Sequence, residues 1–160
     1  MPRFADQRTN SPGYRIGRLY RLGATLLARR LKDLPISGGQ IPLLMEVLHI
    51  DGLTQCQLSE RVGIDPACTA RALANLEEAG LVERVERPRC RRDKQVFATE
   101  RAEVLLGRLL PILAEHSATL LEGFSEAEAA QALGYLDRMI ANEERALADD
   151  AAQPPDKDQG

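Results

Sequence analysis

The chain has 160 residues, of which 44% are hydrophobic and 28% charged, so it can form one domain, or one small domain plus a dimerisation extension, and wholesale disorder is excluded. Aromatic residues make up only 4% and Trp is absent, which argues against aromatic platforms that stack on bases or sugars. No apolar run approaches the roughly 18 residues of a membrane span. The N-terminus has no apolar signal core, so we expect a cytoplasmic protein.

The net charge of −3 hides a polarised chain. Residues 1–32 hold eight Lys or Arg and one acidic residue, and residues 84–94 hold six basic and two acidic residues. Residues 115–160 hold three basic and eleven acidic residues. Only the local field at a contact surface matters for nucleic-acid binding, so a mildly acidic chain can still bind DNA.

The three cysteines, Cys56, Cys68 and Cys90, form no CxxC pair, and His49 and His116 do not stand at ligand spacing from them. The sequence therefore predicts no metal site, no disulfide framework and no cofactor. It also contains no nucleophile elbow, phosphate loop or paired carboxylates at a Gly-rich turn, so we do not expect an enzyme.

The N-terminal third is predicted to be an arm followed by two helices. Residues 1–12 are expected to be a flexible arm. Apolar residues at helical spacing predict a helix over residues 13–34, which Pro35 ends. Ser37-Gly-Gly-Gln40 then predicts the start of a second, mostly buried helix, with Pro42 in its first turn and its end at Asp51-Gly52.

The next block has the signals of a helix-turn-helix. Thr54 and Gln57 form a capping box that opens a helix over residues 55–62, and Gly63 stops it. Asp65-Pro66 is an N-cap with Pro at the first helical position, opening a helix to about Ala79. The residues expected to pack inward from this second helix are Thr69, Ala72, Leu73 and Leu76.

A hairpin is predicted to follow. Residues 81–87 alternate apolar and polar as a half-buried strand does, and residues 94–99 can pair with them antiparallel. The basic segment 88–93 lies between. A helix-turn-helix followed by a hairpin with a basic tip is a winged helix.

The remainder is predicted to be helical. Thr99 can cap a helix running to about Glu122 that Pro111 should bend. Ser125 and Glu128 form a second capping box, opening a helix to about Leu147. Residues 149–160 are expected to be a disordered tail.

Residues 53–99, LTQCQLSERVGIDPACTARALANLEEAGLVERVERPRCRRDKQVFAT, resemble the MarR family of bacterial transcriptional regulators. Helix, Gly turn, Asp-capped helix, Gly stop and Arg-rich wing occur in family order, and the likeness extends over about residues 14–147. Pro111 stands where many members have a Pro. The resemblance implies a mainly α fold with a small β-hairpin wing: a winged helix-turn-helix over residues 37–99, with dimerisation helices at 13–36 and 100–148.

Two departures from the family pattern are evident. The family wing reads D-x-R, five residues, then L-T. Here Cys90 replaces the Asp, Arg92 is kept and Ala98 replaces the Leu. In the family this Asp helps to brace the wing by polar contacts. In this chain Asp93 or Glu86 could take over that role. In the recognition helix, Ala67 and Cys68 stand where members often have Ser and Thr.

The resemblance implies a regulator, usually a repressor, that binds a pseudo-palindromic operator as a homodimer and responds to a small-molecule effector. Arg71 is the strongest candidate for a guanine or phosphate contact, and Ala67 and Ala70 could touch thymine methyls. Wing arginines are expected on the DNA backbone or in the minor groove. The candidate DNA contacts are Thr54, Gln55, Pro66, Ala67, Cys68, Ala70, Arg71, Asn75, Arg87, Arg89, Arg91 and Arg92, although Thr54 can serve simply as the cap.

Other interpretations stay open. The terminal helices could complete a monomeric core instead of a dimer. Tyr20, Met45 and His49 could border an effector pocket. Neighbouring arginines would lower the pKa of the Cys90 thiol, and Cys68 lies at a helix N-terminus, so a thiol-based redox regulator is an alternative. A winged-helix interaction protein without specific DNA readout is another, because Ala67, Cys68 and the missing wing Asp leave fewer polar contacts.

Overall fold

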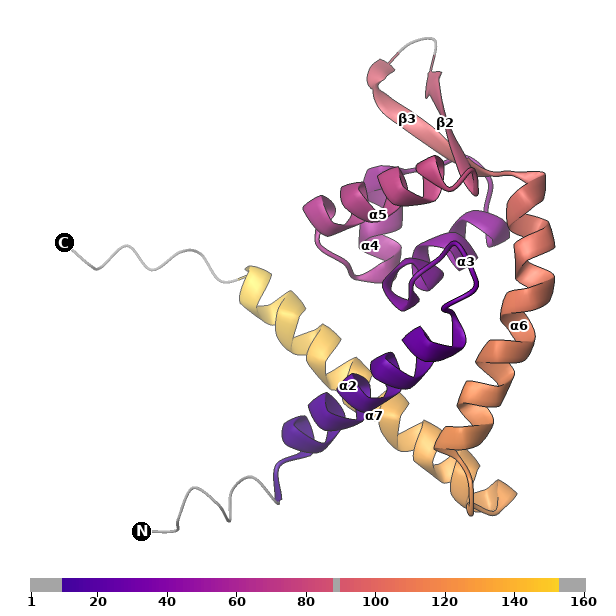
Figure 1. Ribbon diagram of the computed structural model, residues 1–160. Helices are drawn as coiled ribbons and strands as arrows, with labels where there is room; N and C mark the ends of the chain where they lie inside the picture. Colours follow the sequence, from indigo (N-terminus) through magenta and orange to yellow (C-terminus); the bar gives the residue numbers. More distant parts are fainter. Residues whose placement is uncertain (1–9, 88–89, 153–160) are drawn as a thin grey trace. The chain divides into compact units, whose positions relative to one another are not determined.

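The computed structural model describes residues 10–87 and 90–152, without the side chains of residues 87–93. The chain forms two compact units, residues 1–116 and 117–160. The first holds the winged helix, with elements in the order α2, η1, α3, β1, α4, α5, β2, β3 and α6 (Figure 1). The second unit contains α7. Within the described ranges, no helix has the length and hydropathy to cross a membrane.

The helix α2 spans Pro12–Arg30, so it begins inside the segment expected to be an arm and ends a turn before the expected Leu34. The Ser11 hydroxyl accepts a hydrogen bond from the Tyr14 backbone N–H at 3.3 Å, which caps its start. Near its end, the Leu34 N–H donates to the Leu31 carbonyl at 2.8 Å in a tight turn. The predicted end at Leu34 was wrong. Pro35 sterically disfavours helical dihedral angles at the residue before it, and α2 ends before Leu34.

The next helix begins as predicted, but through one 3₁₀ turn. This turn, η1, spans Gly38–Gln40 and leads into α3, Ile41–His49. The Gln40 Oε1 accepts hydrogen bonds from both the backbone N–H and the hydroxyl of Ser37, each at 2.8 Å. A capping side chain thus fixes where the chain turns into the core.

The helix-turn-helix is confirmed. Helix α4 spans Gln55–Val62 and α5 spans Pro66–Glu78. The Gln57 N–H donates to the Thr54 hydroxyl at 3.3 Å, while the Thr54 N–H donates to Gln57 Oε1 at 2.9 Å. The Asp65 carboxylate accepts from the N–H groups of Ala67 and Cys68, at 2.9 and 3.1 Å. These caps satisfy donors that a helix start leaves unpaired.

The hairpin is also confirmed, but the sheet has a third strand. Strands β1 (Leu53–Thr54), β2 (Val82–Arg87) and β3 (Cys90–Ala98) pair antiparallel in the order β1-β3-β2. A two-residue strand is too short to show a period of two, so no pattern in the sequence indicates β1. Strand β3 begins four residues before the expected Lys94. The alternation expected for β2 was wrong at Val85, which is 46% exposed.

The core of the first unit lies between α3, α4, α5, the sheet and the first half of α6. Thr69, Leu73 and Leu76 of α5 are fully buried, as predicted, whereas Ala72 is only partly buried. The other fully buried side chains of the core include Leu43, Leu44, Val47, Leu58, Leu81, Val96 and Leu109.

Helix α2 is joined to α6 by polar contacts inside this unit. The Arg30 guanidinium lies 3.2 Å from Glu115 Oε1 and 3.5 Å from His116 Nδ1. Helix α6 spans Glu100–Leu120, two residues shorter than predicted, and contains Pro111. The Thr99 hydroxyl accepts from the Ala102 N–H at 3.4 Å, which confirms its capping role.

Helix α7 spans Glu126–Ala152. The Ser125 N–H donates to Glu128 Oε2 at 2.9 Å, and this bond with that of the Ser125 hydroxyl lowers the pKa of the Glu128 carboxyl. Residues 149–152 are helical, so the expected tail was wrong there; residues 153–160 lie outside the described ranges. The division into DNA-binding and dimerisation segments is functional and stays a prediction.

Two glycines in left-handed turns provide a matched test of this fold. Gly52 has φ of 74°, and a Cβ there would lie 2.8 Å from Gln95 Nε2 and 3.2 Å from Phe97 Cζ. Gly63 has φ of 67° with nothing within 4 Å of such a Cβ. Gly63→Ala should therefore lower the free energy of unfolding by about 1–2 kcal/mol, the cost of left-handed backbone alone.

Gly52→Ala should cost about 1 kcal/mol more than Gly63→Ala, because Gln95 must also give up its 2.9 Å hydrogen bond to the Gly52 carbonyl. Urea unfolding of the two variants beside the wild type measures both changes in stability. Equal changes would contradict the close approach of β3 to Gly52.

Candidate nucleic-acid interface

The outer face of α5 is accessible along its length. Pro66, Ala67, Cys68, Arg71 and Asn75 are exposed, as the sequence predicted. Ala70 is half-buried and Ala74 is exposed. Apart from Arg71, the first two turns of this face thus present small or apolar side chains and one thiol.

Arg71 is the only basic residue of α5. Its Nη2 lies 3.1 Å from Cys68 Sγ, so the guanidinium turns toward the N-terminal end of the helix. The hydroxyl of Thr69 is directed the other way, because it donates to the Ile64 carbonyl at 3.4 Å in the core. A base edge that faces this part of α5 would meet the N–H donors of the Arg71 guanidinium and the methyl groups of the neighbouring alanines.

The start of α4 offers less than the sequence suggested. Thr54 is only 7% exposed, and its hydroxyl and N–H are both used in the cap with Gln57. A side chain buried in this way acts as a helix cap and is poorly accessible to DNA. Gln55 is half-buried and keeps an accessible position at the helix N-terminus, where backbone N–H groups favour a phosphate.

The basic wing is positioned by the β2–β3 hairpin. Arg87 pairs with Cys90 at its outer end, after an irregularity between Glu86 and Arg87. The backbones of Arg91 and Arg92 lie in β3, but their side chains, with those of Arg87 and Cys90, are outside what the structure describes. Arg89 also lies outside the described residues. The DNA contacts assigned to these four arginines, and the redox role of Cys90, stay predictions.

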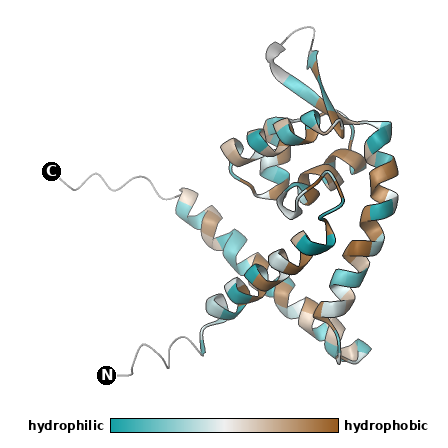
Figure 2. Cartoon of the chain, in the orientation of Figure 1, coloured by the Kyte–Doolittle hydropathy of each residue, from teal (hydrophilic) through white to brown (hydrophobic). Residues whose placement is uncertain are grey.

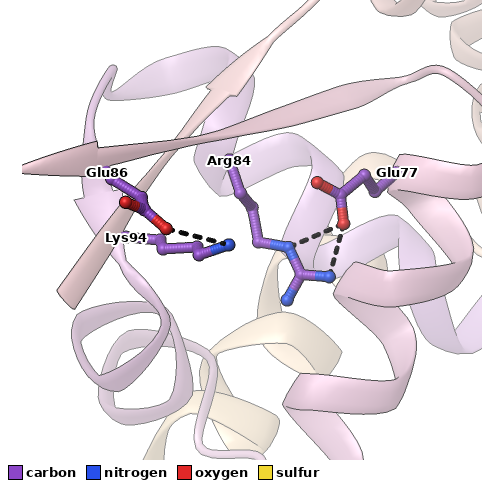
Figure 3. A network of polar contacts seen from close by, with 4 residues as sticks. All are labelled: Glu77, Arg84, Glu86 and Lys94. Carbon is purple, nitrogen blue, oxygen red and sulfur yellow. Dashed lines mark hydrogen bonds and ion pairs between the residues drawn. The ribbon is translucent and has the colours of Figure 1, made fainter. Parts of the chain in front are cut away.

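A charged network that the sequence did not reveal joins the wing to α5 (Figure 3). The Arg84 guanidinium donates through Nε, at 2.8 Å, and through Nη2 to the same oxygen of Glu77. Across the hairpin, Lys94 Nζ lies 3.8 Å from Glu86 Oε1. The hydrogen bond from Arg84 holds the pKa of the Glu77 carboxyl below its usual range. Glu86, one candidate for the missing brace, thus pairs across the two strands of the wing, and its bracing role stays a prediction.

The three residues suggested for an effector pocket differ in exposure, and their role stays a prediction. Tyr20 is 74% exposed on α2, Met45 is half-buried against the core, and His49 is exposed at the end of α3. A shallow, open hollow in the same unit is formed by one face of α2 and by Lys32 just after its end. Its lining residues are Ala24, Thr25, Ala28, Arg29 and Lys32.

Comparison with known proteins accounts for this arrangement. The MarR family model matches residues 32–93. A MarR transcriptional regulator from Methanosarcina mazei Go1 is 30% identical, with a TM-score of 0.77 over 84% of this chain and 96% of that one.

Two more distant structures share the fold. The transcriptional repressor CouR, solved bound to a 23-mer DNA duplex, is 20% identical with a TM-score of 0.76, over 84% of this chain and 95% of that one. The regulator PcaV from Streptomyces coelicolor, solved with its natural ligand, is 22% identical with a TM-score of 0.73, over 83% and 94% of the two chains. With its confirmed winged helix-turn-helix and a 30% identical relative matched over nearly its whole length, the chain belongs to the MarR family of DNA-binding transcriptional regulators, which are not enzymes.

Proposed function

We propose that the protein is a homodimeric repressor that binds a pseudo-palindromic operator, reads bases with α5, and is released by a small-molecule effector. The observation that carries the DNA part is the exposed face of α5, on which Arg71 is the sole cation among small side chains. A two-fold dimer places two such helices on successive major grooves, which is why its operator would be a pseudo-palindrome.

On this face, Arg71 donates to the O6 and N7 atoms of a guanine, the commonest specific contact in the major groove. Ala67 and Ala70 contact thymine methyl groups, and Asn75 lies further along the helix. The wing arginines follow the phosphate backbone, with Arg92 as the member that keeps the family pattern. The basic stretch 84–94 supplies the positive field that draws the duplex in.

The dimer part of the proposal is supported by apolar residues that are exposed on α2 and α7. Figure 2 shows hydrophobic residues along both helices. No residue of α7 is buried, although it carries an apolar stripe, and α2 likewise has no buried residue. The exposed large apolar residues are Tyr14, Ile16, Leu19, Tyr20 and Leu22 on α2, and Leu133, Tyr135, Leu136, Met139, Ile140 and Leu147 on α7. Contiguous exposed apolar surface of this kind marks an interface.

Charge adds to this support. Helix α2 carries five Arg and no acidic residue, whereas α7 carries seven acidic and two basic residues. Opposite charges on the two apolar helices would steer copies into reciprocal pairing and disfavour the pairing of α2 with α2.

The effector part is supported by the likeness in fold to PcaV, which binds its natural ligand. Release from DNA is its test. Small molecules related to the products of neighbouring genes would be added to the protein bound to a labelled duplex from upstream of its own gene. A compound that releases the duplex and raises the protein's melting temperature supports the proposal, whereas release without binding to the protein contradicts it.

Two substitutions separate the reading of bases from general electrostatic attraction to DNA. Arg71→Ala should weaken binding to the operator by about 1–3 kcal/mol and have much less effect on random DNA, because the variant lacks the guanidinium that donates to a base. Arg92→Ala should weaken binding to both duplexes and reduce the salt slope by roughly 0.9 for each phosphate that the wing no longer neutralises. Salt titrations on both duplexes measure the two effects.

Equal weakening of both duplexes by Arg71→Ala would refute its role in direct readout. If neither substitution affects binding, α5 and the wing are not the DNA-reading surface, and the winged-helix interaction protein becomes the better interpretation.

The proposed dimer is tested by the molecular mass in solution. Light scattering should give twice the chain mass of 17.6 kDa. Replacing both Leu136 and Ile140 by Asp should reduce this to one chain mass, because each side chain contributes about 1.5–3 kcal/mol when buried. Gln131→Asp introduces one negative charge, half of that change, on the opposite side of α7 and should leave the dimer intact. A monomeric wild type, or a dimer in all three proteins, would contradict the proposed interface.

A further inference from the structure

The inner face of the hairpin changes character as it leaves the core. Val82 faces Ala98, Arg84 faces Val96, and Glu86 faces Lys94 across the two strands. Directly opposite residues lie on the same face of a sheet. Val82 and Val96 are 2% and 0% exposed, so apolar packing holds this end of the hairpin.

One pair further out, packing gives way to charge. The side chains of Glu86 and Lys94 are 57% and 47% exposed and lie 3.8 Å apart. Arg84 stands at the boundary, with its side chain 24% exposed, and reaches across to Glu77 in the last turn of α5. It therefore joins β2 to the last turn of α5 (Figure 3).

We propose that Arg84 and Glu77 are positioning residues that fix the angle between α5 and the wing, so that both elements engage one duplex. Neither side chain contacts DNA in this arrangement. The inference rests on the proposed DNA-reading surface and adds to it the device that sets its geometry.

The chemistry of the pair suits this role. Two guanidinium N–H groups, from Nε and Nη2, converge on one Glu77 oxygen, so the contact restrains direction as well as distance. The wing position at which the family has a bracing Asp is Cys90 in this chain. A restraint at the base of the hairpin can supply the orientation that the missing Asp would otherwise give.

The direction in which one substitution changes the affinity for DNA distinguishes a positioning role from simple electrostatics. Glu77→Gln removes a negative charge near the DNA-reading helix, and electrostatics alone would make the variant bind DNA more tightly. If Glu77 positions the wing, the same variant binds more weakly. Glu78, exposed at the next position of α5, provides a matched control that removes the same charge.

The experiment uses the full chain and a duplex selected by the wild-type protein from a randomised pool, with affinity followed by fluorescence anisotropy. Glu77→Gln should bind about three- to fivefold more weakly, which matches a partly exposed ion pair. Glu78→Gln should bind as tightly as the wild type or more tightly. The exchanged pair Glu77→Arg with Arg84→Glu restores an ion pair without changing net charge and should bind better than Arg84→Glu alone.

Two further measurements check the mechanism. Thermal unfolding should show that each variant stays folded at the temperature of the binding assay. In Arg84→Ala, the pKa of the Glu77 carboxyl should rise toward its ordinary value, as followed by its NMR chemical shift.

Equal or tighter binding by Glu77→Gln overturns the inference alone, as does an exchanged pair no better than Arg84→Glu, which would indicate a direct phosphate contact by Arg84. A wild-type chain that selects no duplex overturns the proposed DNA-binding function as well, so the two failures are distinguishable.

Discussion

The turn between α4 and α5 is the constraint on which the DNA-reading surface depends. Gly63 takes a left-handed conformation, and the Ile64 carbonyl that follows accepts hydrogen bonds from the hydroxyls of Ser59 and Thr69, at 2.5 and 3.4 Å. Asp65 then caps α5. These contacts fix the rotation of α5 about its axis: with Thr69 held inward, the leucines of the same stripe enter the core, and Arg71 must lie on the outside.

The sheet extends the same constraint to the wing. Strand β3 is held on one side by β1, where the Gly52 N–H donates to the Val96 carbonyl at 3.1 Å, and on the other by β2. Apolar packing ends at Val96 and the ion pair of Arg84 continues the restraint outward. Among the described residues, the β1 edge of the sheet and the Arg84–Glu77 ion pair restrain the wing from outside the hairpin, and the positioning role proposed for that pair would make the orientation of the wing sensitive to single charges.

The sequence was most informative where side chains act on their own helix. The capping residues Thr54 and Asp65 located α4 and α5 to within a residue, because a cap and its partner are three residues apart at most. The end of α2 was misjudged because its apolar spacing continues to Leu34 in residues that form a turn, and α7 lacks a stop signal before Ala152. The Glu77–Arg84 contact could not be predicted, since its geometry depends on how β2 packs against α5.

A reading helix with one donor fork limits how much specificity base contacts can supply. The bidentate contact proposed for Arg71 would contribute about 1–3 kcal/mol, and the proposed dimer would double this. Specific operators are bound roughly 4–10 kcal/mol more tightly than random DNA. In the proposed complex, methyl contacts from Ala67 and Ala70 and the sequence-dependent shape of the minor groove would supply the rest. The shape of the minor groove can be read only when the wing arginines reach that groove while α5 lies in the major groove. If α5 reads bases as proposed, a chain with so few polar groups on that helix would depend more heavily on the angle at which its wing is held.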